Sequence, residues 1–211
     1  MIGGSVNRLL LSFALVPLLA TPALAATPSE FMSQGIATSF ATANSPEQST
    51  PVKFYYRNGM VRLELKMMGG TPSVILAHKG SSTVTMLDPT QKMAFTTSLA
   101  GFGSMPGAPP LNQLMDATQW KSILFKRSHR LPGTAIIGNE RCSIWENTSG
   151  PNRYKVWFDD KQDLPMQLEG RVNGKLRFRY TVYHLSTYPV NRNLFTVPAG
   201  YHRAQLTRAK S

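Results

Sequence analysis

The stretch Val52-Lys-Phe-Tyr-Tyr-Arg-Asn-Gly-Met-Val-Arg-Leu-Glu-Leu-Lys-Met-Met68 decides the fold class of this chain. From residue 60 onward apolar side chains alternate with charged ones, and the apolar positions are Val61, Leu63, Leu65 and Met67. A period of two is typical of a β-strand with one buried face. Asn58-Gly59 separates this run from the preceding apolar run, which is the strongest short-range signal of a hairpin. The stretch therefore predicts two antiparallel strands joined by a tight turn.

Similar short runs, separated by turn residues, continue along the chain. We expect further strands at residues 73–78, 83–87, 93–97, 122–129, 134–137, 141–146, 154–159, 165–172 and 176–187. An antiparallel sheet of this many strands is too long to lie flat and has to curl. The fold class is therefore mainly β, with little helix.

Residues 98–119 break this rhythm. They begin with a segment rich in Gly and Pro that carries Leu99, Phe102 and Met105, and a short helix is expected at residues 111–120. A long insert with apolar side chains is either a flap over a cavity or an irregular loop. Both interpretations stay open at this point.

The last predicted hairpin has a register that its side chains constrain. A two-residue turn at Asn173-Gly174 without a bulge would place Leu168 opposite Arg179 and mix apolar with charged residues on each face. One more residue in the turn, or a bulge beside it, pairs Val172 with Leu176, Leu168 with Tyr180 and Met166 with Val182, and leaves Glu169 opposite Arg179. We expect the longer turn.

The first 25 residues have the pattern of a secretory signal peptide. Asn7-Arg8 precedes an apolar stretch, and Ala23-Leu24-Ala25 places small residues at a cleavage site, which we expect after Ala25. No Cys directly follows that site, so a lipid anchor is not expected. The predicted organisation is a signal peptide at 1–25, a flexible segment with a first strand at 26–50, one domain at 51–203 and a basic tail at 204–211.

The composition is basic, with 23 Lys and Arg against 11 Asp and Glu, a formal net charge of +12. Export removes nucleic acid as a natural partner, so the charge indicates an anionic membrane surface, lipopolysaccharide or an acidic polymer, or serves solubility alone. The candidate residues for an anionic headgroup or surface are Arg171, Arg177 and Arg179 on the final hairpin.

The sequence carries no catalytic signature. The four His are scattered, and the single Cys, Cys142, is expected to pack as a small buried side chain. We therefore predict a protein that is not an enzyme and that has no cofactor and no metal.

Three stretches resemble the LolA-like superfamily, the periplasmic carriers of outer-membrane lipoproteins and their relatives. Tyr56-Arg-Asn-Gly-Met-Val-Arg-Leu-Glu64 is similar to that family's strand pair, and Ala77-His-Lys-Gly-Ser-Ser-Thr-Val-Thr-Met-Leu-Asp-Pro89 to its hairpin. The third comprises Val156-Trp-Phe-Asp159, Leu164-Pro165 and Asn193-Leu-Phe-Thr-Val-Pro-Ala-Gly-Tyr201. Gly138-Asn-Glu-Arg-Cys142 is closer to uncharacterised secreted relatives than to the true carrier.

The resemblance implies an unclosed half barrel of antiparallel strands, with one or two short helices covering an apolar cavity that receives acyl chains. Arg57 would match the family's lid-contacting arginine. The side chains expected to form the cavity and lid are Leu63, Leu65, Met67, Phe102, Met105, Leu114 and Trp120.

The expected function is that of a periplasmic carrier or binding protein, most simply a monomer, for a lipid, a lipoprotein acyl chain or another amphiphile. The alternative is a non-enzymatic envelope sensor or protein-interaction module built on the same fold.

Overall fold

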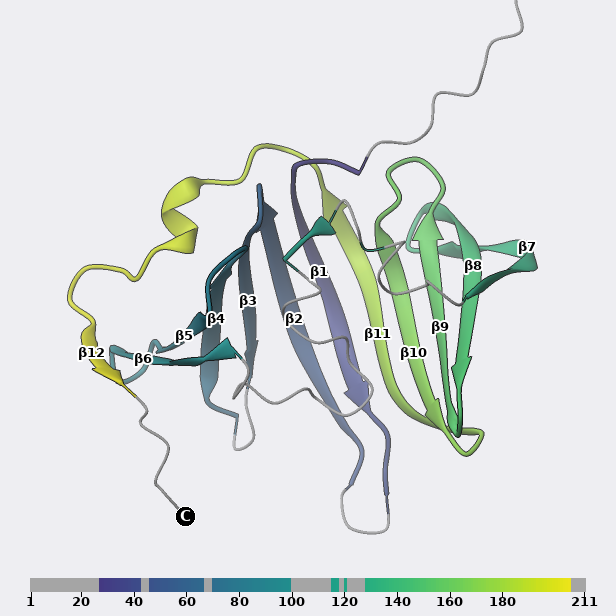
Figure 1. Cartoon of the computed structure of the whole chain (residues 1–211), viewed down its shortest axis with the longest axis horizontal. Coiled ribbons are helices and arrows are strands. Elements are labelled where there is room, and N and C mark those ends of the chain that lie inside the picture. Colours follow the sequence, from purple (N-terminus) through teal and green to yellow (C-terminus); the bar gives the residue numbers. More distant parts are fainter. Residues whose placement is uncertain are drawn as a thin grey trace, which may run out of the picture.

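The computed structural model describes residues 27–42, 46–66, 70–99, 115–117, 120 and 128–205. Within these ranges it forms twelve strands and one short 3-10 helix (Figure 1). The elements are β1 (Glu30–Ser39), β2 (Gln48–Arg57), β3 (Met60–Lys66), β4 (Pro72–His78), β5 (Thr83–Asp88), β6 (Met93–Ser98), β7 (His129–Ile137), β8 (Glu140–Ser149), β9 (Asn152–Asp159), β10 (Pro165–Val172), β11 (Lys175–Ser186), η3 (Arg192–Phe195) and β12 (His202–Gln205).

The strands form one sheet in the order β12-β6-β5-β4-β3-β2-β1-β11-β10-β9-β8-β7. The meander β1 to β6 and the meander β7 to β11 meet where β1 pairs with β11, for example at Gly35 and Val182. In Figure 1 the strands at both ends of the sheet turn away from the direction of the central strands. β12 and β7 are the two ends of the strand order, so the predicted mainly antiparallel, unclosed sheet is confirmed.

The hairpin predicted between β2 and β3 is present. Arg57 pairs with Met60, and the two turn residues Asn58 and Gly59 both have positive φ angles, 47° and 82°. Such a turn matches the twist of the strands that it joins. The pairing places Phe54 opposite Leu63 and Tyr56 opposite Val61, which brings the apolar side chains of both strands onto one face.

The longer turn predicted between β10 and β11 is wrong. The turn has two residues, Asn173 and Gly174, with φ angles of 50° and 75°, and Val172 pairs with Lys175. The register shifts one pair later, between Gly170 and Arg171, so that Leu168 still lies opposite Tyr180 and Glu169 opposite Arg179. Of the two ways to match the faces, the chain uses the bulge and not the expected longer turn, because the Asn-Gly pair favours the tight turn.

Both faces of the sheet carry apolar side chains at β4. Ile75 and Ala77 belong to the larger core cluster, whereas Val74 and Leu76 belong to a second cluster with Leu87 and Ala94. Neighbouring residues of a strand point to opposite faces. The second cluster is covered by Val197 and Tyr201 of the segment that follows β11, which explains why the interior of β4 is buried on both sides.

The segment after β11 had no predicted secondary structure. It runs past the ends of the strands to the far end of the sheet, where β12 pairs in parallel with β6 (Figure 1). On the way Asn191 caps η3 by accepting a hydrogen bond from the backbone N of Asn193, and Arg62 of β3 donates to the Leu194 carbonyl oxygen at 2.8 Å.

Several predicted features lie outside the described residues. They are the signal peptide at 1–25, most of the helix at 111–120, most of the strand at 122–129 and most of the tail at 204–211. Among the described residues no helix has the length and apolar character needed to cross a membrane.

Candidate functional site

An aromatic cluster lies on one face of the sheet, which we call the Trp120 face. The Phe31 ring of β1 lies between Phe54 and Tyr56 of β2, with ring centroids 5.8 Å and 5.3 Å away. The Trp120 ring meets the Phe31 ring edge-on at 5.6 Å and lies 5.8 Å from Phe54. All four side chains are buried, so a side chain from the link between β6 and β7 covers the middle of the sheet.

Two polar contacts attach this link to the sheet next to the aromatic cluster. Lys79, in the turn between β4 and β5, donates a hydrogen bond to an Asp116 carboxylate oxygen at 2.6 Å. The backbone N of Ala117 donates to the Tyr56 hydroxyl at 3.4 Å. The hydrogen bond with Asp116 raises the pKa of Lys79 above its usual value. We call the Lys79–Asp116 pair the latch.

Three of the predicted cavity residues are described, and all three belong to this cluster. Leu65 is buried on β3, Leu63 on the same strand is half-buried, and Trp120 is buried in the same cluster. They pack together with Phe54, Ile75 and the rest of the larger core cluster. The remaining predicted residues, Met67, Phe102, Met105 and Leu114, lie outside the described residues.

Arg57, the residue matched to the lid-contacting arginine, has described partners elsewhere. Its guanidinium donates to the Val190 carbonyl oxygen and lies 3.4 Å from a Glu30 carboxylate oxygen. The other Glu30 oxygen accepts a hydrogen bond from the Val190 backbone N at 2.9 Å. Arg57 and Glu30 therefore bind the segment that follows β11 to the sheet, and a contact between Arg57 and the lid stays a prediction.

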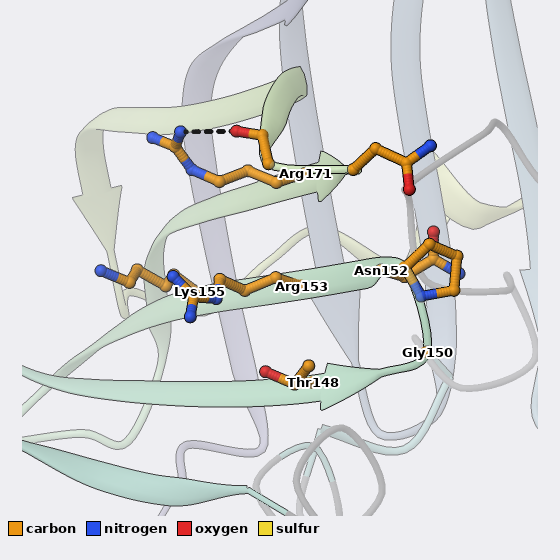
Figure 2. Close-up of a pocket in the computed structure, with 9 residues that line it drawn as sticks. Thr148, Gly150, Asn152, Arg153, Lys155 and Arg171 are labelled. Atoms are coloured by element: carbon orange, nitrogen blue, oxygen red, sulfur yellow. Dashed lines mark hydrogen bonds between the residues drawn. The ribbon is translucent and has the colours of Figure 1, made fainter.

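The three predicted headgroup arginines of the final hairpin have different partners. Arg179 lies 2.7 Å from the buried Glu169 carboxylate and 5.7 Å from the centre of the Phe40 ring. Arg177, the extra residue of the bulge, donates to the Ala41 carbonyl oxygen at 3.3 Å. Arg171 alone of the three lines a pocket of about 480 Å³, which is formed with Arg153 and Lys155 of β9 (Figure 2).

Sequence reasoning missed Phe31, Phe54 and Tyr56 in the first site, and Arg153 and Lys155 in the second. The sequence allowed a prediction of Phe54 and Tyr56, because a two-residue turn at Asn58-Gly59 places them on the same face as Leu63 and Val61. Phe31 depends on the pairing of β1 with β2, and Arg153 depends on the pairing of β9 with β10. Neither pairing has a signal as strong as the Asn-Gly turn.

The described ranges contain no group of three or more His, Cys, Asp or Glu side chains that could hold a metal ion. Cys142 is fully buried, as predicted, and packs against Met166 and Val182. Burial first, and then the negative charge of Asp159, raise the pKa of the Cys142 thiol to about 11, which keeps it protonated at neutral pH.

No protein-family model and no curated protein matches the chain. Among solved structures it is similar to an uncharacterized conserved protein from Thermus thermophilus, with 7% identity and a TM-score of 0.57 over 84% of this chain and 91% of that one.

Two further solved structures match with lower scores. A LolA superfamily protein from Nitrosomonas europaea matches with 12% identity and a TM-score of 0.41, over 82% of this chain and 92% of that one. A DUF1329 family protein from Desulfovibrio piger matches with 10% identity and a TM-score of 0.41, over 81% of this chain and 90% of that one. The chain shares its fold with the Thermus thermophilus protein, and at these identities the likeness concerns the fold alone.

Proposed function

We propose that this chain is a non-enzymatic periplasmic protein that binds a lipid, a lipoprotein acyl chain or another amphiphile on the Trp120 face. The observation that carries the proposal is the cluster of Phe31, Phe54 and Tyr56, which is covered by Trp120 from a link between strands rather than by a second sheet. An acyl chain that takes the place of the link on this face gains about 0.8 kcal/mol for each buried CH₂ group.

The latch gives this exchange a physical basis. The Lys79 side chain of the latch is 61% exposed and that of Asp116 is 13% exposed, so the pair lies at the edge of the buried cluster, where water and salt screen it from the side of Lys79. Displacement of Asp116, Ala117 and Trp120 breaks the latch and the hydrogen bond from Ala117 to Tyr56, and the aromatic rings of the sheet exchange one apolar partner for another. In this mechanism binding requires Trp120 to leave its contacts with Phe31 and Phe54.

Tryptophan fluorescence tests the location of the ligand. The chain has three Trp, so a variant with Trp145→Phe and Trp157→Phe reports on Trp120 alone. We expect a brominated fatty acid to quench this variant strongly. The matched control, Trp120→Phe with Trp145→Phe, retains Trp157, which packs in a separate cluster with Cys142 and Met166, and should be quenched much less. Equal quenching in both variants, or no binding of fatty acid by either, would contradict the proposal.

A second experiment tests the role of the link. Lys79→Gln breaks the latch and should raise the affinity for a fluorescent fatty acid a few-fold, because the binding-competent form becomes more populated. Lys161→Gln is the control, since it breaks a pair at 2.9 Å with Glu140 of β8, a strand that β11, β10 and β9 separate from β1 in the sheet. Native mass spectrometry of protein purified from its host would then identify the bound amphiphile.

One observation favours the alternative of a sensor or protein-interaction module. β7 is the last strand in the order of the described sheet, and Ile136 on it is 67% exposed. A strand at an edge can accept an extended segment of a partner protein. A stoichiometric protein partner from an envelope extract that is lost with Ile136→Lys, but kept when Arg171, Arg177 and Arg179 are neutralised, would favour this function over lipid binding.

A further inference from the structure

The pocket at the ends of the β8–β9 and β10–β11 hairpins lies on the face opposite to the Trp120 face. Tyr180 and Ala37 pair with each other and pack against the larger core cluster, whereas their neighbours Arg179 and Thr38 point away from it. Arg179 pairs with Glu169, and Glu169 pairs with Lys155. The pocket therefore belongs to a polar face that the aromatic cluster does not reach.

Two arginines lie directly opposite each other in this pocket. Arg153 of β9 pairs with Arg171 of β10, and Arg153 also pairs with Thr148 of β8. Figure 2 shows the side chains of Arg153, Lys155 and Arg171 extending in the same direction along their strands. Like charges directly opposite each other in a sheet destabilise it. A site with this arrangement is stabilised by an anion that touches both guanidinium groups.

The carboxylates nearby neutralise this charge in part. Glu146 lies 3.5 Å from both Arg153 and Lys155, and Glu169 lies 3.4 Å from Arg171. Charge-assisted N–H···O bonds are shorter, about 2.7–2.9 Å, and the pair that has this length is Glu169 with Arg179, at 2.7 Å. Arg179 thus holds one Glu169 oxygen at short range, and Arg153, Lys155 and Arg171 lie farther from their carboxylate partners, at 3.4–3.5 Å.

The arginines of this cluster are more exposed than the glutamates. The Glu146 and Glu169 side chains are 9% and 7% exposed, whereas those of Arg153 and Arg171 are 52% and 36% exposed. Four cations, counting Lys155 and Arg179, surround two carboxylates. The cluster has an excess of positive charge, with the guanidinium groups facing solvent and the carboxylates beneath them.

We propose that this pocket binds a phosphate-type oxyanion, carried either by a small soluble phosphate compound or by a phospholipid headgroup. Arg153 and Arg171 would hold the oxygens, because the planar guanidinium group matches phosphate geometry. Lys155 adds charge, and Thr148 and Asn152 line the same pocket with neutral polar groups. The volume of about 480 Å³ lies in the range of small-molecule sites. The site does not depend on the function proposed for the Trp120 face.

Titration of the full chain with inorganic phosphate at low ionic strength, followed by calorimetry, tests the site. We expect the wild type to bind phosphate. The affinity should fall about tenfold or more in the variant Arg153→Gln with Arg171→Gln. The control, Lys66→Gln with Arg203→Gln, removes the same charge from exposed positions on β3 and β12 and should keep the wild-type affinity. No phosphate binding by the wild type, or an equal loss in the control, overturns the proposal.

Vesicles distinguish the two sources of the phosphate group. Retention on phosphatidylcholine vesicles containing phosphatidylglycerol, with competition by inorganic phosphate, identifies a lipid headgroup; phosphate binding without retention identifies a soluble compound. Retention that phosphate does not compete with places the membrane contact elsewhere and overturns the assignment of this pocket.

Arg153→Lys with Arg171→Lys keeps the charge and should bind phosphate more weakly than the wild type. Fatty-acid binding, measured on the same variants, should be unchanged, so that a failure of either proposal is seen separately.

Discussion

At the scale of single residues, Gly35 marks a close approach between β1 and β11. An added Cβ there would lie 2.5 Å from the Thr181 carbonyl oxygen and 2.7 Å from the Tyr180 ring. Gly35→Ala should therefore lower the free energy of unfolding by about 2–3 kcal/mol, measured by urea denaturation. Gly133→Ala is the comparison, since its added Cβ meets nothing and its φ of 87° leaves backbone strain of about 1 kcal/mol as the cost. Equal losses would show that contact with Tyr180 and Thr181 is unimportant.

Cys142 allows a prediction about pH. Its thiol has a pKa of about 11 in the folded chain because of burial and of Asp159, which lies opposite it on β9. In the unfolded chain the thiol ionises near its ordinary value of 9.0. Its contribution to stability is therefore fully present below pH 9 and is lost as the pH rises towards 11.

The measurement is the rate of alkylation by iodoacetamide as a function of pH. The folded chain should react very slowly at pH 8, and Asp159→Asn should shift the rate profile to lower pH because it removes the negative charge opposite the thiol. The rate for chain unfolded in urea is the control. Rapid reaction of the folded chain at pH 8 would contradict the burial of this side chain.

At the scale of elements, the bulge at Arg177 reconciles the two-residue turn with the pairing of β10 and β11. Deleting Arg177 removes the residue that has no partner on β10, so that Phe178 can still lie opposite Gly170 and Tyr180 opposite Leu168. We expect the deletion variant to fold, and Arg177→Ala to lower the melting temperature by no more than about 3 °C. Circular dichroism with thermal melting checks both, and a deletion variant that fails to fold would contradict the assignment of Arg177 as the extra residue.

This hairpin also shows how far sequence patterns reach. Matching the apolar and charged faces of the two strands predicted that Leu168 lies opposite Tyr180 and Glu169 opposite Arg179. Both pairs are present. The position of the irregularity did not follow, because the same face matching is achieved by a longer turn or by a bulge. The two-residue turn forms instead of a longer one because Asn173 and Gly174 both adopt positive φ angles readily.

At the scale of the whole molecule, the sheet depends on the segment that follows β11. A chain that ends at Tyr188 would lose Val190, η3 and β12, and with them the cover over Val74 and Leu76. We expect it to melt roughly 10 °C lower and to bind the dye ANS more strongly. A chain that ends at Gln205 keeps every described contact and is the control. Unchanged melting of the shorter chain would show that this cover is dispensable.

The unclosed, mainly antiparallel sheet was predictable because each strand is a local pattern bounded by turn residues. The strand order was not, since the pairings of β1 with β11 and of β12 with β6 join segments far apart in the sequence. The candidate sites divide in the same way. Leu63 and Leu65 follow from alternation along β3, whereas Phe31 reaches the Trp120 face, and Arg153 reaches Arg171, through pairings between strands.

The pairing of β1 with β11 also has a consequence for the order of folding. Gly35 is among the first described residues to be synthesised, and its partner Val182 is among the last. The pairing in the middle of the sheet therefore cannot form until nearly all of the described sequence is available, and folding through so distant a contact is slow. Until then β1 presents an unpaired edge, which is a target for chaperones and a risk for aggregation.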